Sequence, residues 1–190
     1  MDVKHIQKTE LARGKQSGIS LIELMIAMSV LLIGVLGSMM PVIVSIGASG
    51  RNRQQSNSTV IAQMVEEKIM SVPASTSPVL QITDCTGVAQ NINTAGGPAP
   101  GGAGALLTAA GDADFTQAQG SAGAPAGYFL NYTNCGTNGR QMVFDVRWNI
   151  QTVSGFNKLV AVSAKLRVNG TNAKIIAFPV TIRSMAGQGS

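Results

Sequence analysis

A long apolar run that contains one carboxylate constrains this 190-residue chain more than any other feature. The run extends from Ile19 to about Ile46, and Glu23 is its only charged residue. Its length is about what a helix needs to cross a bilayer. A charge inside hydrocarbon costs on the order of 2.5 kcal/mol or more, so we expect Glu23 to be paired or to have a function.

Residues 1–18 form a short basic leader ahead of this run. Its bases are Lys4, Lys8, Arg13 and Lys15, opposed only by Asp2 and Glu10. Such a leader orients a following membrane segment with the N-terminus in the cytoplasm. A secretory signal has its small residues after the apolar core, whereas Gly18 stands before it. From the residues alone, a conventional cut within residues 45–49 (SIGAS) and an uncleaved anchor both stay open.

The pattern predicts one helix from Ile19 to about Val72, some 54 residues or roughly 80 Å long. Its second half has apolar residues at spacings of three and four, which predicts a stripe on which the rest of the domain packs. The stripe consists of Val60, Ile61, Met64, Val65, Ile69 and Val72. Pro41 is expected to kink the helix because it removes a backbone hydrogen bond, and Pro73 is expected to end it.

The segment from Thr94 to Gly127 is dominated by Gly, Ala and Pro, which predicts a long mobile surface loop. Three strands are expected after it, in an antiparallel meander, because β-branched residues partly alternate between turn signals. They cover residues 142–151, 158–168 and 174–183. Pro179 within the third strand indicates an edge strand or a bulge.

Two cysteines, Cys85 and Cys135, lie downstream of the apolar run and are too far apart for a CxxC motif. If this part of the chain lies outside the cytoplasm, a disulfide is expected. It would close a loop of about 50 residues and stabilise the fold by roughly 4 kcal/mol in the chain-entropy model. Two buried free thiols are the alternative.

The residues offer little for catalysis, and we expect no metal and no cofactor. The only histidine, His5, lies in the leader, so the body has no His-based triad and no His-ligated metal. Asp112 and Asp114 are calcium-ligand types, but their Gly-rich surroundings favour simple solvation. Asp84 and the pair at residues 66–67 are interpreted as surface polar groups.

The excess of basic over acidic residues does not indicate nucleic-acid binding. The formal net charge is +5, but four of the bases lie in the leader. The remaining bases do not cluster in the sequence, and aromatic residues make up only 4% of the chain. We therefore expect no nucleic-acid partner.

The stretch "KQSG" followed by "ISLIELMIAMSVLLIGVLG" resembles the class III signal of type IV pilins and pseudopilins. The shared elements are a basic leader ending in glycine, an apolar residue after the cut, and glutamate as the fifth residue of the mature chain. The resemblance implies that a prepilin peptidase cleaves between Gly18 and Ile19 and methylates the amine of Ile19. It also makes Glu23 the carboxylate that sets register during assembly. Residues 29–37 are most similar to PilV-type minor pilins.

The resemblance implies an α+β fold, the type IV pilin fold, in which a long N-terminal helix packs on a C-terminal antiparallel sheet. The expected divisions follow the chain in order. They are a cleaved leader at 1–18, a membrane or filament-core half of the helix at 19–47, its amphipathic half at 48–73, a variable loop region at 74–141 with the insert 94–127, and the sheet at 142–190.

The function implied is a minor pilin, a non-enzymatic subunit that helps initiate, cap or modify a type IV pilus. The alternatives are a minor pseudopilin of a type II secretion system and an uncleaved membrane-anchored periplasmic binding protein with the Gly-rich loop as a lid. Expected partners are the prepilin peptidase, other pilins or pseudopilins, the inner-membrane assembly platform and, before assembly, membrane lipid. The expected location is the bacterial inner membrane, with the C-terminal domain in the periplasm, and then the filament. Contact surfaces are expected at 94–127 and around Trp148, although Trp148 itself is expected in the core.

Overall fold

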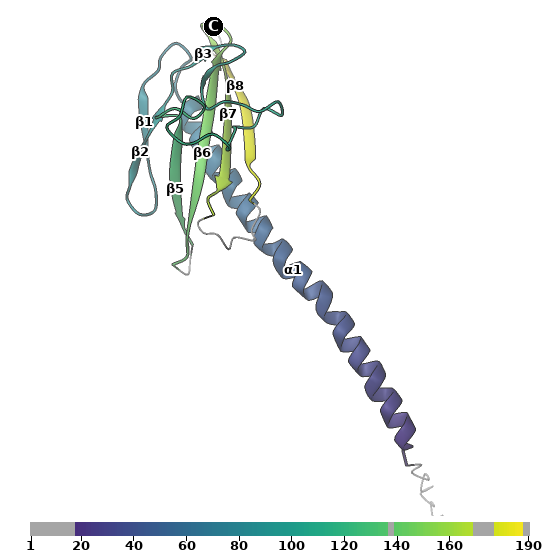
Figure 1. Cartoon of the computed structure of the whole chain (residues 1–190). Coiled ribbons are helices and arrows are strands. Elements are labelled where there is room, and N and C mark those ends of the chain that lie inside the picture. The colour runs from purple at the N-terminus through teal and green to yellow at the C-terminus, as the bar shows by residue number, and fades with distance from the viewer. Residues whose placement is uncertain (1–17, 137–138, 169–176, 188–190) are drawn as a thin grey trace, which may run out of the picture. The chain divides into compact units, whose positions relative to one another are not determined.

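The computed structural model describes residues 18–136, 139–168 and 177–187. The chain separates into two compact units, residues 1–47 and 48–190. Helix α1, Leu21–Met70, supplies the described helical part of the first unit and the first element of the second (Figure 1). The sheet of the second unit completes the predicted α+β fold, which the structure confirms.

The second half of α1 buries an apolar stripe against the sheet. Ile61, Val65 and Ile69 are at most 2% exposed and lie in one core cluster with strand residues. Val60 was expected in this stripe, but its side chain is 59% exposed. The reason is rotation, because Val60 lies about 140° around the helix from the buried Val65, whereas Ala62 lies only about 60° from it. Ala62 lies in the core instead.

Four antiparallel strands form the main part of the larger sheet, with the order β5-β6-β7-β8 (Figure 1). Their bounds are β5 Phe129–Cys135, β6 Gln141–Thr152, β7 Asn157–Leu166 and β8 Val180–Gly187. The predicted meander over the last three is thus confirmed. Strand β8 begins after Pro179, later than predicted, and residues 174–176 lie outside the described residues. Among the described strands β8 is at the edge of this sheet, as proline before it indicated.

Strand β6 is the centre of this sheet. Two short strands, β3 (Gly97–Pro98) and β4 (Ala103–Gly104), also pair with β6. They pair with its C-terminal end, after the residues that pair with β5. Alternate residues of β6, among them Val146 and Trp148, face the core shared with α1. The residues between them, Arg147 and Asn149, are also buried. Both faces of β6 are therefore covered.

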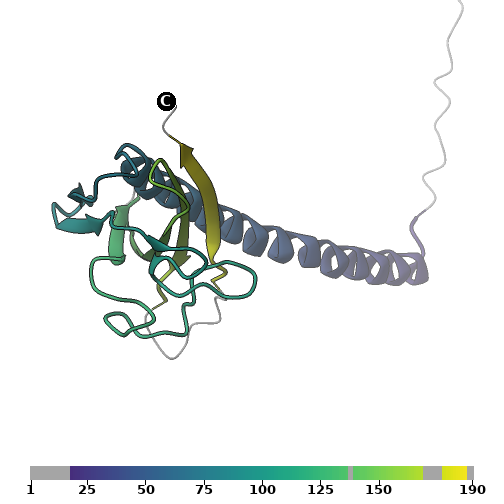
Figure 2. The same ribbon diagram turned by 90° about the horizontal axis from the view of Figure 1, so that it is seen from above.

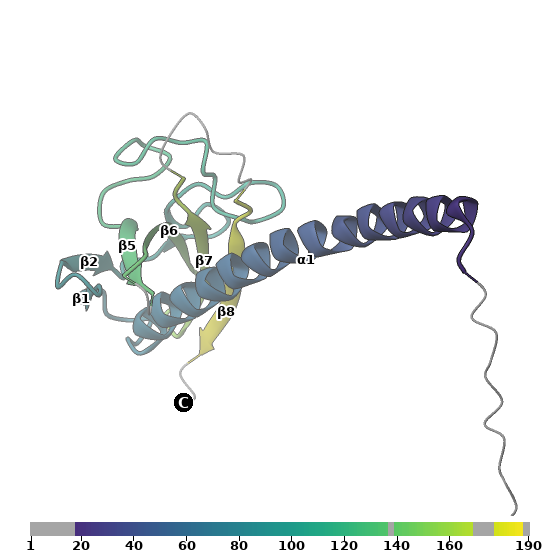
Figure 3. The ribbon, with the colours of Figure 1, turned by 90° about the horizontal axis from the view of Figure 1, so that it is seen from below.

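The cover on the second face is the Gly/Ala/Pro-rich segment 94–127, which the structure places opposite α1 (Figures 2 and 3). Its backbone is bonded to the sheet, with Ala105 N donating to Trp148 O at 2.8 Å and Ala113 N to Ser163 Oγ at 2.9 Å. Small residues permit this approach: a Cβ on Gly104 would lie 2.3 Å from the carbonyl oxygen of Trp148. The segment is thus a packed layer, which differs from the mobile loop that its composition predicted.

The region 74–141, expected as loops, also contains a hairpin. Strands β1 (Val79–Thr83) and β2 (Ala89–Asn93) pair with each other in a separate two-stranded sheet. Polar residues interrupt both strands without regular alternation, as in "AQNIN", so the apolar signal of a strand is weak. Ile82 and Ile92 still reach the core, which attaches the hairpin to the larger sheet.

Candidate functional site

The residues singled out by the sequence lie at the start of α1. Gly18, Ile19 and Ser20 precede the helix and are exposed, and a Cβ added to Gly18 would meet nothing within 4 Å. The peptide bond between Gly18 and Ile19 therefore lies in an irregular, accessible stretch, as a peptidase requires. Glu23 lies in the first turn of the helix, where a negative charge is favoured by the helix dipole.

The apolar half of α1 has no cover within the described part of the chain. Every side chain described between Gly18 and Gly47 is exposed, including Ile19 at 75%. The helix is long and apolar enough to cross a membrane, although a signal sequence near an N-terminus meets the same criteria. An apolar surface of this extent requires lipid or other protein around it.

Pro41 lies inside α1, and the helix is continuous on both sides of it. A proline at such a position removes one backbone hydrogen bond and crowds the preceding turn. The bend that this implies stays a prediction. Gly34, Gly37 and Gly47 lie in the same apolar half, each with open space where a Cβ would be.

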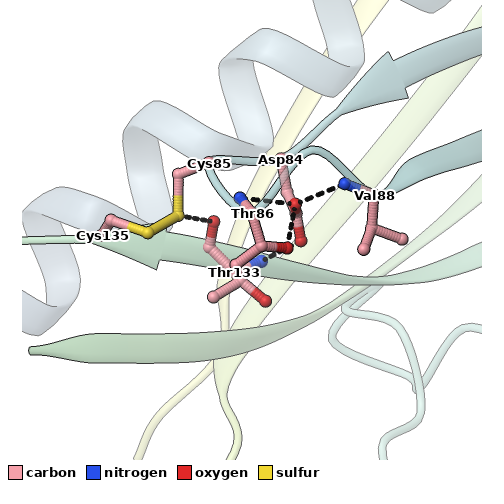
Figure 4. Close-up of a disulfide and its surroundings, with 6 residues drawn as sticks. All are labelled: Asp84, Cys85, Thr86, Val88, Thr133 and Cys135. Atoms are coloured by element: carbon pink, nitrogen blue, oxygen red, sulfur yellow. Dashed lines mark hydrogen bonds between the residues drawn. A yellow bond between two sulfur atoms is a disulfide. The ribbon is translucent and has the colours of Figure 1, made fainter.

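Cys85 and Cys135 form a disulfide, with their Cα atoms 5.8 Å apart (Figure 4). The bond joins the turn of the β1–β2 hairpin to the end of β5, and it confirms the predicted pairing over the alternative of two free thiols. Cys85 Sγ lies 3.0 Å from Thr133 O, a contact only, since a bonded sulfur carries no proton. The chain between the two cysteines includes the whole of the Gly/Ala/Pro-rich layer.

Asp84, beside this disulfide, was interpreted as a surface polar group and is in fact buried. Its Oδ1 accepts hydrogen bonds from Thr86 Oγ1 at 2.6 Å, Thr86 N at 2.9 Å and Val88 N at 3.1 Å (Figure 4). The hydrogen bond from the Thr86 hydroxyl, helped by those from the backbone, lowers the pKa of Asp84 to about 2. The carboxylate therefore closes the hairpin turn, a structural role that the sequence did not reveal.

Gln90 joins the same hairpin to β5 in a way that mimics a strand. Its side-chain oxygen accepts from Asn131 N at 3.0 Å, and its Nε2 donates to Asn131 O. One side-chain amide thus satisfies both backbone groups of a residue on the outer edge of β5. Covering an edge in this way protects it from pairing with another chain.

Of the two acidic residues considered for calcium, Asp114 has structural partners for its side chain. Asp114 Oδ1 accepts from Thr116 N at 2.9 Å and from Thr116 Oγ1 at 2.6 Å, and the hydroxyl bond is the main cause that lowers the pKa of Asp114. Asp145 is paired with Arg147 at 2.8 Å. Over the described residues, no three His, Cys, Asp or Glu side chains lie together as a metal site would need.

Arg147 anchors the Gly/Ala/Pro-rich layer to β6. Its Nη1 donates to Asp114 O at 2.8 Å and to Gln117 O at 2.9 Å, and its guanidinium lies 4.8 Å from the centre of the Phe115 ring. This role could not be predicted from the sequence, because the partners lie some 30 residues away. Trp148 next to it is fully buried, so the contact surface expected around its ring is not an exposed aromatic.

The C-terminus of α1 is held by a buried lysine on the sheet. Lys158 Nζ donates to Ile69 O and to Val72 O, each at 2.6 Å, and its side chain lies in the core at 2% exposure. Burial lowers the pKa of the Lys158 amine. Lysine at the first predicted position of a strand was the only sequence signal for this contact.

The start of the chain matches a known family. Residues 13–39 match the family described as the prokaryotic N-terminal methylation motif. No curated protein matches the chain, and no solved structure does. The matched residues include Gly18, Ile19 and Glu23, the three positions that the resemblance had assigned to processing and assembly.

This match supports a type IV pilin or pseudopilin subunit, processed by a prepilin peptidase and assembled with other pilins. The exposed apolar helix fits a membrane-anchored subunit or one packed in a filament. The α+β architecture, a long N-terminal helix with a sheet domain, is consistent with the type IV pilin fold.

Proposed function

We propose that this protein is a minor pilin, a non-enzymatic subunit that helps initiate, cap or modify a type IV pilus. The methylation motif at residues 13–39 carries the proposal. The exposed bond after Gly18, the acidic first turn of α1 and the uncovered apolar half behind it are what such a subunit needs. The likeness of residues 29–37 to PilV-type minor pilins supports the assignment within the family.

Cleavage between Gly18 and Ile19 creates the partner that Glu23 lacks. The new amine of Ile19, which the peptidase methylates, carries a positive charge. In a bundle of apolar helices this amine can pair with Glu23 of a neighbouring subunit. A helix docked at the wrong height would leave one charge buried alone, at a cost of several kcal/mol. We propose that this pairing sets the register while the apolar residues provide cohesion.

The proposed divisions of the chain follow from the same assignment. Residues 1–18 are the cleaved leader, 19–47 the membrane or filament-core half of the helix, and 48–73 its amphipathic half. The domain beyond is proposed to lie in the periplasm before assembly, with the N-terminus in the cytoplasm, as the basic leader favours. The assembly platform of the inner membrane is the proposed partner during filament growth.

A minor pseudopilin of a type II secretion system is the second candidate, since the same motif fits both systems. Recovery of the protein in pili sheared from the cell surface supports the first candidate, and its absence there with retention in the periplasm supports the second. The third candidate, an uncleaved binding protein with residues 94–127 as a lid, gains no support from a segment bonded to the sheet.

The test of the proposal is the variant Glu23→Ala. Both it and the wild type should insert in the membrane and be cleaved, because the substitution leaves the other residues of the apolar run and the bond after Gly18 unchanged. Without Glu23, the neighbouring amine stays unpaired at a cost of about 3 kcal/mol or more, so incorporation into filaments should fall at least about tenfold. Incorporation is measured by immunoblotting of sheared filaments against the membrane fraction.

Glu67→Ala is the matched control. Glu67 is an exposed glutamate of the same helix, outside the apolar run, so its loss should leave incorporation unchanged. Normal incorporation of the Glu23→Ala protein would contradict the proposed role of the carboxylate.

A further inference from the structure

Strands β5 and β8 are the outer two of the four long antiparallel strands, and the hairpin covers the outer edge of β5. Gln90 bonds both backbone groups of Asn131. Cys85 N donates to Thr133 O at 3.4 Å, and Thr133 N donates to Asp84 Oδ2 at 3.4 Å. The outward backbone groups of β5 at these two positions are therefore already bonded within the chain.

The outer edge of β8 has no such cover in the described part of the chain. Val153 N donates to Asn157 O at 2.9 Å, so the odd-numbered residues of β7 bond β6. Because the bonding side alternates along a strand, the even-numbered residues of β7 bond β8. The register of β7 with β8 then turns the backbone groups of four β8 residues outward. They are Thr181, Arg183, Met185 and Gly187. None of their backbone groups is bonded to a described residue.

Strand β8 also lacks the features that usually keep an edge from pairing with another chain, such as a short length, a bulge, lysine or proline. It has eight residues in one unbroken register with β7, and Pro179 stands before it. Its one charged residue, Arg183, turns towards the Gly/Ala/Pro-rich layer, where the guanidinium donates to Ala110 O. Met185 presents an apolar side chain that is 63% exposed. The edge is therefore open to a further strand.

The two faces of β8 indicate which side chains an added strand would carry. Ile182 packs against the core that the sheet shares with α1, so an apolar neighbour on that face would extend the core. On the opposite face Arg183 is exposed, and it has no carboxylate within 4.0 Å among the described residues. An acidic residue of the added strand on that face would pair with it.

We propose that the outer edge of β8 pairs with an extended segment of a different filament subunit. This segment alternates apolar residues with polar ones, and an acidic residue lies opposite Arg183. A second copy of this chain lacks that chemistry, because β1, which pairs only with β2 among the described strands, has no charged residue. The inference rests on the proposed function, since it names a contact between filament subunits. Backbone bonds would give the affinity, and the alternating side chains the specificity.

The test is the variant Met185→Pro in the full chain. Proline removes the N–H of residue 185, which points away from β7, so the β7–β8 bonds are kept while one bond to the added strand is lost. Met185→Ala is the matched control, because it removes the side chain and keeps the N–H. Incorporation into sheared filaments should fall at least about fivefold for Met185→Pro and less than about twofold for Met185→Ala. Denaturant unfolding of both variants checks that the fold is kept.

A second measurement keeps the backbone intact and identifies the partner. The photocrosslinking residue benzoylphenylalanine replaces Met185 in the full chain, and the adducts in sheared filaments are mapped by mass spectrometry. The crosslinked residue should lie in an extended segment of another pilin-type subunit, two positions from an Asp or Glu, because side chains on one face of a strand recur every second residue. Adducts with lipid, with another copy of this chain or with the helix of a neighbouring subunit would contradict the inference.

The wild-type chain separates this inference from the proposed function. If the wild type is incorporated into filaments and Met185→Pro is incorporated equally well, the inference is overturned and the proposed function stands. Equal losses for Met185→Pro and Met185→Ala lead to the same conclusion, because they assign the contact to the side chain. A wild-type chain that is absent from surface filaments overturns both.

Discussion

Lys158 places a charged amine among the carbonyl groups that end helix α1. The last carbonyls of a helix have no partner within it, and the negative end of the helix dipole favours a cation there. Because the amine comes from β7, this contact also ties the helix to the sheet. A buried charge serves here as a cap from a distant part of the chain.

Lys158→Met tests this role. Methionine fills a similar volume but makes no hydrogen bond to the carbonyl oxygens of Ile69 and Val72, and Ile69 O keeps only the 3.4 Å bond from Val72 N. The free energy of unfolding should therefore fall by about 2 kcal/mol. The measurement is denaturant unfolding followed by circular dichroism. Lys68→Met removes the same charge from an exposed position in the last turn of α1, and its effect should stay within about 0.5 kcal/mol. Equal effects of the two substitutions would refute the capping role.

The low pKa of Asp84 predicts that the stability of the fold depends on pH. Its folded-state pKa of about 2 is below the usual 3.8, so its contribution to stability is fully present above the usual value and is lost as the pH falls through about 2. The stability difference between the wild type and Asp84→Asn should therefore be constant above about pH 5 and shrink between pH 4 and pH 2. Urea unfolding at a series of pH values measures it. A difference that does not change over this range would count against the bonded carboxylate.

At the scale of elements, regular patterns were predictable and side-chain contacts were not. The helix and the three late strands could be predicted because the spacing of apolar residues in the sequence indicates whether one face or both faces of an element are buried. The Gly/Ala/Pro-rich layer was missed because its order comes from bonds to residues such as Arg147 and Ser163, far away in the chain. Glu23 could be singled out as a candidate functional residue because the leader glycine and the glutamate lie close together in the sequence. The roles of Lys158 and Asp84 could not be predicted, because only the folded structure shows which groups their side chains bond.

The packed layer makes a prediction for hydrogen exchange. The backbone amides of Ala105 and Asp114 donate to Trp148 O and Leu106 O, each at 2.8 Å, so they should exchange at least about tenfold more slowly than free amides of the same type. Arg147→Lys should speed exchange at residues 114–117, because lysine cannot reproduce the bonds of the guanidinium group. Exchange measured residue by residue by NMR decides this. Unprotected amides throughout 94–127 would restore the view of a mobile loop.

At the scale of the whole molecule, the two units differ in what they need. Residues 48–190 contain a core closed by helix, sheet, layer and disulfide. The apolar half of α1 has no such cover within the described residues and must take it from lipid or from neighbouring subunits. Under the proposed function, one chain suits two successive environments, the membrane and then the filament.

The mass of the mature protein tests the central claim most directly. The protein is purified from the membrane fraction of cells that contain a prepilin peptidase, and its intact mass is measured without proteolysis. Cleavage after Gly18 with methylation predicts the mass of residues 19–190 with one disulfide and one added methyl group. In cells that lack the peptidase the mass should be that of the whole chain. A full-length mass, or a cut within residues 45–49, in the presence of the peptidase would contradict a pilin-type subunit.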